Sequence, residues 1–116
     1  MFKLSGQIGI VTGAATGIGK AIAERLAAAG ATIAIADLDL PGATRAACSI
    51  GPSAFPVETD VSSDESIRRT VDKVLERTQQ IDILVNNAGI AGPSVITLNP
   101  AIRDQVKTGH RDWPKT

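Results

Sequence analysis

A glycine-rich stretch near the N-terminus constrains the fold of this chain more than any other segment. It runs from Ile10 to Lys20 and reads Ile-Val-Thr-Gly-Ala-Ala-Thr-Gly-Ile-Gly-Lys. The apolar residues 8–11 predict a buried strand that breaks at Gly13, and a helical pattern opens at Gly17. A strand, a glycine turn and a helix in this order hold a diphosphate in α/β proteins, because backbone N–H groups and the positive end of the helix dipole point at it.

Each of the three glycines in this stretch permits something that a side chain would block. Gly13 allows the tight turn, Gly17 clears the path to the phosphates, and Gly19 lets the helix pack closely on the sheet. The spacing G-x-x-x-G-x-G differs from the common G-x-G-x-x-G fingerprint, and a glycine turn without a ligand is the alternative. The residues that follow in the chain decide between the two.

The composition fits one domain with an aliphatic core. Of the 116 residues, 43% are apolar and only 3% aromatic, so Ile, Val, Leu and Ala must fill the interior. Twelve basic and twelve acidic residues cancel, which argues against a nucleic-acid surface. We expect a cytoplasmic protein, since the sequence shows neither a membrane span nor a signal peptide. The single cysteine, Cys48, is expected to be a buried thiol, and no residues have metal-ligand spacing.

Hydrophobic periodicity predicts four strands that alternate with helices. The strands fall at about 7–12, 31–36, 54–57 and 81–85, and the helices at 17–29, between Pro41 and Gly51, and after the capping box Ser62-x-x-Glu65. Strands that are apolar almost throughout are buried on both faces, which indicates a parallel sheet. We therefore predict an α/β fold, half of a Rossmann-type doubly wound sheet with strand order 3-2-1-4, and a ligand crevice between the first and fourth strands.

Two finer expectations concern the helix faces and the end of the chain. The first helix is expected to turn Ile18, Ile22, Leu26 and Ala29 toward the sheet. Residues 1–93 are expected to form the dinucleotide-binding half-domain, and 94–116 a divergent or truncated tail without a fifth strand. Within that tail, Asn99-Pro100 predicts a helix start with Ile102 and Val106 on one side. The fourth strand would then be an open edge through which copies of the chain associate.

Polar residues follow three of the predicted strands. Asp37 ends the second strand, where an acid accepts hydrogen bonds from the adenosine ribose hydroxyls and repels a 2′-phosphate, which favours NAD over NADP. Asp60 follows the third strand and is placed to face an adenine amino group, with Val61 against the ring. Either acid is alternatively a turn residue. Asn86-Asn87-Ala88-Gly89 ends the fourth strand, where small residues let a cofactor approach, although one asparagine is alternatively a tie between strand ends.

Taken together, these motifs resemble the N-terminal half of a short-chain dehydrogenase/reductase over about residues 4–93. The match rests on Leu4-x-Gly6, Thr12-Gly13-x-x-x-Gly17-Ile18-Gly19, Asp37, Asp60-Val61 and Asn86-Asn87-Ala88-Gly89, in order and in spacing. The resemblance implies a set of cofactor-binding residues along the pyrophosphate, the ribose, the adenine and the rest of the dinucleotide. They are Thr12, Gly13, Thr16, Gly17, Ile18, Gly19, Asp37, Asp60, Val61, Asn87, Ala88 and Gly89.

The chain departs from the family where the chemistry is done. Family enzymes transfer a hydride with the help of a serine and a Tyr-x-x-x-Lys pair, and this sequence contains no tyrosine. We assign no catalytic residue, and we expect the parent enzyme to act on an alcohol or ketone and this chain alone to be inactive, as a fragment or the product of a shortened or frame-shifted gene. A non-catalytic dinucleotide-binding or partner-pairing module is the alternative. An epimerase of the extended reductase group is a further one, which the Asn-Asn-Ala-Gly motif disfavours.

Overall fold

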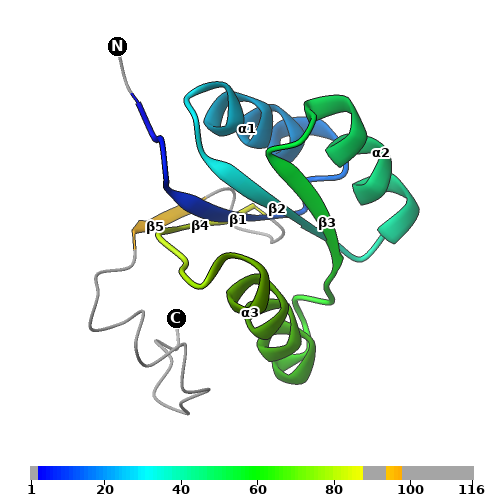
Figure 1. Ribbon diagram of the computed structural model, residues 1–116. Coiled ribbons are helices and arrows are strands. Elements are labelled where there is room, and N and C mark those ends of the chain that lie inside the picture. The colour runs from blue at the N-terminus through cyan, green and yellow to red at the C-terminus, as the bar shows by residue number, and fades with distance from the viewer. Residues whose placement is uncertain (1–2, 88–93, 98–116) are drawn as a thin grey trace.

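The computed structural model describes residues 3–87 and 94–97 of the chain. Helices and strands alternate along it, as an α/β fold requires (Figure 1). The elements are β1 (Ile8–Thr12), α1 (Gly17–Ala28), β2 (Thr32–Asp37), α2 (Leu40–Ile50), β3 (Ala54–Glu58), α3 (Asp64–Thr78), β4 (Ile83–Asn86) and β5 (Ser94–Thr97).

The strands form one sheet in the order β3-β2-β1-β4-β5. The first four are parallel, which confirms the predicted order 3-2-1-4 and the Rossmann-type arrangement. Val11 of β1 lies opposite Ile35 of β2 and Val85 of β4, so the carboxyl ends of these strands reach the same edge of the sheet. That edge carries the glycine turn and the acids that follow the strands.

The fifth strand contradicts the expectation that none follows residue 93. β5 runs antiparallel to β4, with Asn86 opposite Ser94 and Ile83 opposite Thr97. The prediction that β4 is an open edge is therefore wrong, because β5 takes up the hydrogen-bonding groups on that side. Self-association through β4 loses its basis with it.

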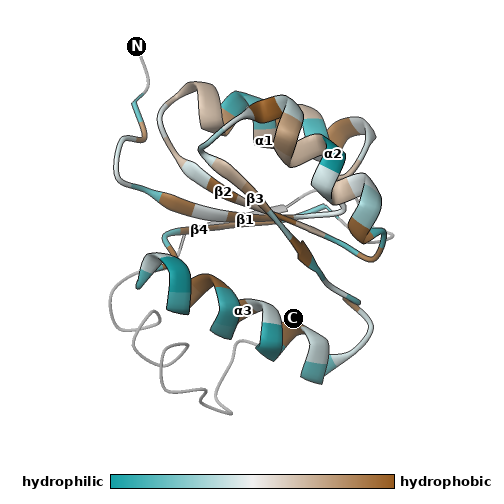
Figure 2. Cartoon of the chain, turned by 45° about the vertical axis from the view of Figure 1, so that its right-hand side comes forward, coloured by the Kyte–Doolittle hydropathy of each residue, from teal (hydrophilic) through white to brown (hydrophobic). Residues whose placement is uncertain are grey.

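The sheet is covered by helices on both faces. α1 and α2 lie on one face and α3 on the other (Figures 1 and 2). Alternate residues of β2 point to opposite faces: Ile33 and Ile35 join the core under α1 and α2, whereas Ala34 and Ala36 join the core under α3. All four side chains have no exposed surface, which explains why β2 is apolar on both faces.

Helix α1 packs against the core with three of the four expected residues, Ile22, Leu26 and Ala29, and only Ile18 departs from the prediction. Gly19 and Ala23 are its buried residues, and Ile22 and Leu26 are partly buried against the core. Ile18, predicted to point inward, is 65% exposed. It lies in the first turn of the helix, next to the glycine turn between β1 and α1.

Helix α2 is bounded as the sequence predicted, but its cysteine is not buried. Pro41 lies in its first turn, Asp39 caps it by accepting a hydrogen bond from the Gly42 N–H, and Gly51 follows its last residue. Cys48 is exposed. The buried face of α2 consists of small residues, Gly42, Ala43, Ala46 and Ala47, and position 48 falls outside that stripe.

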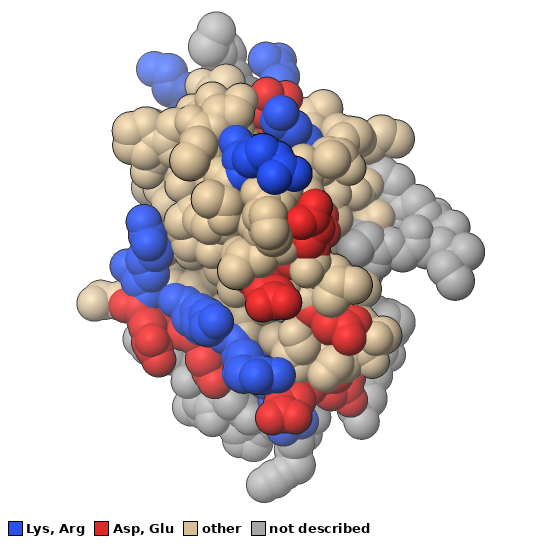
Figure 3. Space-filling model, turned by 90° about the vertical axis from the view of Figure 1, so that its right-hand side faces the viewer, with Lys and Arg blue, Asp and Glu red and all other residues tan. Residues whose placement is uncertain are grey.

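Helix α3 starts one residue later than the predicted capping box. Ser63 is the cap, and its hydroxyl oxygen accepts a 3.2 Å hydrogen bond from the Ser66 N–H. Ser62 instead bonds to Asp60. The exposed surface in Figure 3 shows acidic and basic side chains beside one another. Among the residues described, no helix has the length and apolar character needed to cross a bilayer.

Candidate functional site

The glycine turn lies at the carboxyl edge of the sheet, between β1 and α1. Gly13 and Gly17 both have a φ of +64°, in the left-handed region where other residues are strained. A Cβ added to Gly17 would meet no atom within 4 Å, so this part of the turn faces open space. Thr16 precedes the helix in an extended conformation and makes no side-chain cap. The first N–H groups of α1 are thus not capped by that side chain, which suits an anion.

Gly19 has a packing role, as the sequence predicted. A Cβ at this position would collide with the Gly13 carbonyl oxygen and would come within 2.5 Å of Asn87 Nδ2. The first turn of α1 therefore packs directly against the glycine turn.

The end of β4 is tied to the glycine turn by a set of hydrogen bonds. Asn87 Nδ2 donates to the Gly13 carbonyl oxygen at 3.1 Å, and the Asn87 N–H donates to Thr12 Oγ1 at 3.0 Å. Thr12 Oγ1 in turn lies 3.3 Å from Asn86 Oδ1 and 3.4 Å from the Val85 carbonyl oxygen, to which it donates. The interpretation of an asparagine as a tie between strand ends is therefore correct for Asn87. The part of Thr12 in this set was not foreseen from the sequence.

Asp37 is half-buried at the end of β2, beside the glycine turn. Its Oδ2 accepts a 3.0 Å hydrogen bond from the Ala15 N–H, and its Oδ1 accepts a 2.9 Å hydrogen bond from the Asp39 N–H. A carboxylate has about four lone-pair sites on its two oxygens, so each oxygen keeps one for a further donor. The sequence predicted that Asp37 ends the second strand. Nothing in the sequence predicted its hydrogen bond from the Ala15 N–H.

Asp60 and Val61 follow β3 at the same edge. Asp60 Oδ1 accepts hydrogen bonds from the Ser62 hydroxyl at 2.6 Å and from the Ser62 N–H at 3.0 Å. These two bonds, the hydroxyl bond first, hold the pKa of Asp60 below its ordinary value. Within the chain, Asp60 thus acts as the turn residue that the sequence offered as an alternative. Its carboxylate remains accessible at the surface.

Large apolar side chains are exposed around this edge. Ile18 in the first turn of α1, Leu38 after β2 and Val61 after β3 are 65%, 67% and 40% exposed. Each lies at or just beyond the end of a strand or in the turn that follows, where Asp37 and Asp60 also lie. Exposed apolar side chains that gather at one place indicate a binding surface.

The remaining expected site residues, Ala88 and Gly89, lie outside the described residues. Within the described ranges, no cluster of His, Cys, Asp and Glu is arranged to hold a metal ion. The structure thus brings the glycine turn, Asp37, Asn87 and the Asp60–Val61 pair to one edge of the sheet.

Residues 7–107 match the family of short chain dehydrogenases. This chain belongs to that family.

Relatives of the family share about two fifths of their aligned residues with this chain. Sorbitol dehydrogenase from Cereibacter sphaeroides is 46% identical over 88 residues, which make up 76% of this chain and 34% of that enzyme. A solved structure of 3-ketoacyl-(acyl-carrier-protein) reductase from Brucella melitensis, complexed with NADH, is similar with a TM-score of 0.74 and 41% identity, over 76% of this chain and 36% of that one. Hydroxysteroid dehydrogenase from Escherichia coli has a TM-score of 0.72 and 37% identity, over 75% and 38%. The chain therefore spans about a third of the length of these relatives and corresponds to their N-terminal, cofactor-binding part.

Proposed function

We propose that this chain binds a nicotinamide dinucleotide, NAD in preference to NADP, at the carboxyl edge of its sheet. It would serve as the cofactor-binding part of an oxidoreductase that transfers a hydride between the nicotinamide and an alcohol or ketone. The observation that carries the proposal is Asp37, which lies at the end of β2 and bonds to the glycine turn at Ala15. The NADH in the Brucella relative and the family match support the cofactor class.

The pyrophosphate fits the start of α1. Gly17 leaves open space there, and Thr16 does not cap the helix, so the N–H groups and the helix dipole are directed at an anion. The six residues proposed to line the pyrophosphate and the adjacent ribose belong to this turn and its flanks. They are Thr12, Gly13, Thr16, Gly17, Ile18 and Gly19.

The adenosine ribose fits Asp37. Each carboxylate oxygen keeps a lone pair beyond the bonds to Ala15 and Asp39, so the side chain can hold the turn and accept both ribose hydroxyls at once. A 2′-phosphate would bring a second negative charge against this carboxylate, and like charges at short range repel. Preference for NAD follows from that repulsion.

The adenine fits the edge beside β3. Val61 is exposed and offers an apolar surface for one face of the ring, and Asp60 is an acceptor for its amino group. Asn87, with Ala88 and Gly89 outside the described residues, is proposed to lie along the rest of the dinucleotide. The bonds of Asn87 to Thr12 and Gly13 fix that strand end in place.

The bound dinucleotide would supply the hydride, and the residues of this chain bind and orient it. The sequence contains no tyrosine, so the family's usual proton-transferring group is absent from these 116 residues. We therefore propose that the chain alone binds the cofactor without oxidising an alcohol or reducing a ketone.

A titration of NADH and NADPH into the chain, followed by calorimetry and by NADH fluorescence, tests this proposal. NADH is expected to bind more tightly than NADPH. Asp37→Ala is expected to weaken NADH binding by about 10- to 100-fold, as the loss of hydrogen bonds to a charged group implies. Asp72→Ala, an exposed acid on α3, is the matched control and should leave the affinity unchanged. Failure of the folded protein to bind either dinucleotide, or equal effects of the two substitutions, would contradict the proposal.

A further inference from the structure

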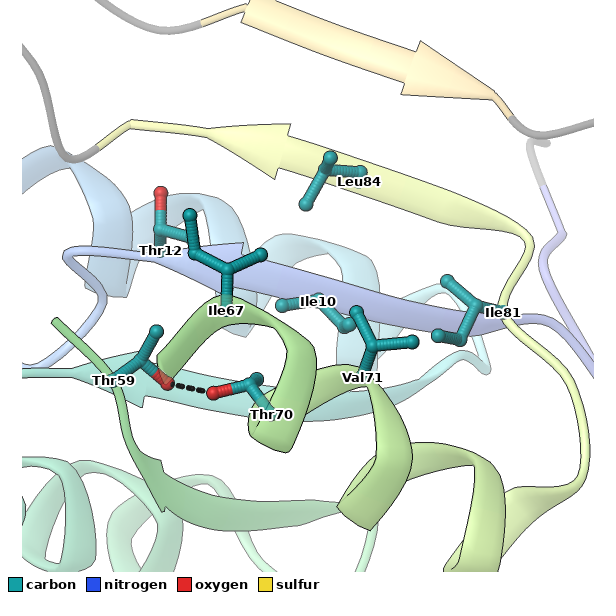
Figure 4. Close-up of a pocket in the computed structure, with 8 residues that line it drawn as sticks. All are labelled: Ile10, Thr12, Thr59, Ile67, Thr70, Val71, Ile81 and Leu84. Carbon is teal, nitrogen blue, oxygen red and sulfur yellow. Dashed lines mark hydrogen bonds between the residues drawn. The ribbon is translucent and has the colours of Figure 1, made fainter. Parts of the chain in front are cut away.

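Two hydroxyl side chains of α3 hold the segment that follows β3. Ser66 Oγ accepts a 2.8 Å hydrogen bond from the Asp60 N–H. Thr70, one helical turn further along α3, is hydrogen-bonded to the Thr59 hydroxyl at 2.6 Å, as the dashed line in Figure 4 marks. Positions four apart lie on the same face of a helix, so one face of α3 contacts two successive residues of this segment.

The backbone of Asp60 is held by this helix and not by a neighbouring strand. The hydrogen bonds between β2 and β3 continue as far as Thr59, whose N–H donates to the Asp37 carbonyl oxygen at 2.9 Å. The N–H of the next residue, Asp60, donates to Ser66 Oγ instead. The position of Asp60 relative to Asp37 therefore depends on α3 as well as on the sheet.

The bonds around Asp60 leave one of its carboxylate oxygens for a ligand. Oδ1 accepts from both the hydroxyl and the N–H of Ser62. The Asp60 carbonyl oxygen accepts from the Ser63 N–H at 3.0 Å. The hydrogen bonds among the described residues do not involve Oδ2. The carboxylate is thus fixed through Oδ1, and Oδ2 is the acceptor that remains for a donor outside the chain.

We propose that Ser66 is a positioning residue for recognition of the adenine base. By holding the Asp60 N–H, it fixes the carboxylate whose Oδ2 accepts a hydrogen bond from the adenine amino group. The inference rests on the function proposed above, in which the adenine lies beside Asp60 and Val61. It makes the site selective for adenine, because a base with a carbonyl in place of the amino group would set two acceptor oxygens against each other.

The substitution Ser66→Ala removes the acceptor for the Asp60 N–H and leaves the other bonds of Ser66 in place. Its backbone N–H, which donates to the Ser63 cap of α3, is retained. Its carbonyl oxygen, which accepts from the Thr70 hydroxyl, is retained as well. The start of α3 and the bond between Thr59 and Thr70 are therefore expected to persist in this variant.

The ratio of two affinities tests the proposal. NADH and reduced nicotinamide hypoxanthine dinucleotide, whose base has a carbonyl where adenine has its amino group, are titrated into the full 116-residue chain. The wild type is expected to bind NADH about tenfold more tightly, as one hydrogen bond to a charged group implies. Ser66→Ala should reduce this ratio to about two- to threefold, whereas Ser66→Thr, which keeps the hydroxyl, should retain it. A general loss of stability would lower both affinities alike and leave the ratio unchanged.

Two further variants control this measurement. Ser49→Ala, at an exposed position of α2, should leave the ratio at its wild-type value. In an Asp60→Ala background, Ser66→Ala should not change the ratio further, because Ser66 acts through Asp60. A wild-type ratio near one, or a ratio that Ser66→Ala leaves unchanged, would overturn the positioning role while NADH binding still supports the proposed function. Wild-type protein that binds neither dinucleotide would refute that function and this inference together.

Discussion

The side chain of Asn87 and the carbonyl oxygen of Gly13 are joined by a 3.1 Å hydrogen bond across 74 residues of chain. This bond connects the end of β4 to the turn between β1 and α1. The turn that is proposed to hold the pyrophosphate is thus held from the β4 side by Asn87 and from the β2 side by Asp37.

Replacing Asn87 should loosen the turn. Asn87→Ala removes the donor to Gly13, and we expect the free energy of unfolding to fall by about 1–2 kcal/mol. Urea unfolding followed by circular dichroism measures this change. Asn86→Ala is the control from the neighbouring position, since Asn86 is exposed and its side chain accepts from the Thr12 hydroxyl, whereas the bond to Gly13 comes from Asn87. An equal loss in the two variants would mean that the Asn87–Gly13 bond is not the cause.

Gly19→Ala and Gly17→Ala should both destabilise the fold, but for different physical reasons. Gly19→Ala drives a methyl group into the Gly13 carbonyl oxygen and Asn87, so we expect a loss of about 1–3 kcal/mol in unfolding free energy. Gly17→Ala meets no neighbouring atom, and its cost is the strain of a positive φ, about 1–2 kcal/mol. Thermal unfolding ranks the two. A variant with alanine at position 19 that is as stable as the wild type would refute the close contact.

The hydrogen bonds to Asp60 should make stability depend on pH. Its pKa is lowered in the folded state by the Ser62 hydroxyl and N–H, so the stabilisation is present above the unfolded pKa of about 4 and is lost as the pH falls through the folded pKa. Asp60→Asn should lower the urea midpoint slightly at pH 7 and no longer do so at strongly acidic pH. Ser62→Ala should reproduce the effect in part. A difference between wild type and Asp60→Asn that stays constant over this range would contradict the assignment.

Asp82 is a buried acid whose loss should be costly. Its Oδ2 accepts hydrogen bonds from the Ile8 N–H at 2.9 Å and from Gln80 Nε2 at 2.7 Å. Asp82→Ala leaves the buried Ile8 N–H without this acceptor, and we expect a loss of about 1–3 kcal/mol in unfolding free energy. Asp72→Ala, on the exposed face of α3, should change it by no more than about 0.5 kcal/mol. Chemical denaturation of both variants tests the contrast.

The sequence predicted those parts of the fold that depend on local patterns. The order of strands and helices followed from apolar runs and from helix ends such as Pro41 and Gly51. The glycine positions followed as well, because a tight turn and a close helix contact leave few alternatives to glycine. The cofactor roles of these residues stay predictions, to be tested by the titration above.

What the sequence missed depends on contacts between distant segments. Strand β5 has four residues, and only its pairing with β4 makes it a strand. The exposure of Ile18 and of Cys48 depends on where each helix meets the sheet, which periodicity gives only to within a residue or two. Ser62 and Ser63 are adjacent serines, and the choice of cap was decided by the bond from Ser62 to Asp60.

The reversal of direction at β5 has a consequence for anything that follows it. Each parallel crossover in this sheet returns the chain to the amino edge and then carries it up to the edge where the glycine turn lies. β5 runs down instead, and its last residue lies opposite Ile83, the first residue of β4. Thr97 therefore lies about 10 Å, three residue steps along a strand, from the edge where the glycine turn lies. A side chain that follows β5 in the sequence can lie at that edge only if the backbone spans the height of the sheet once more.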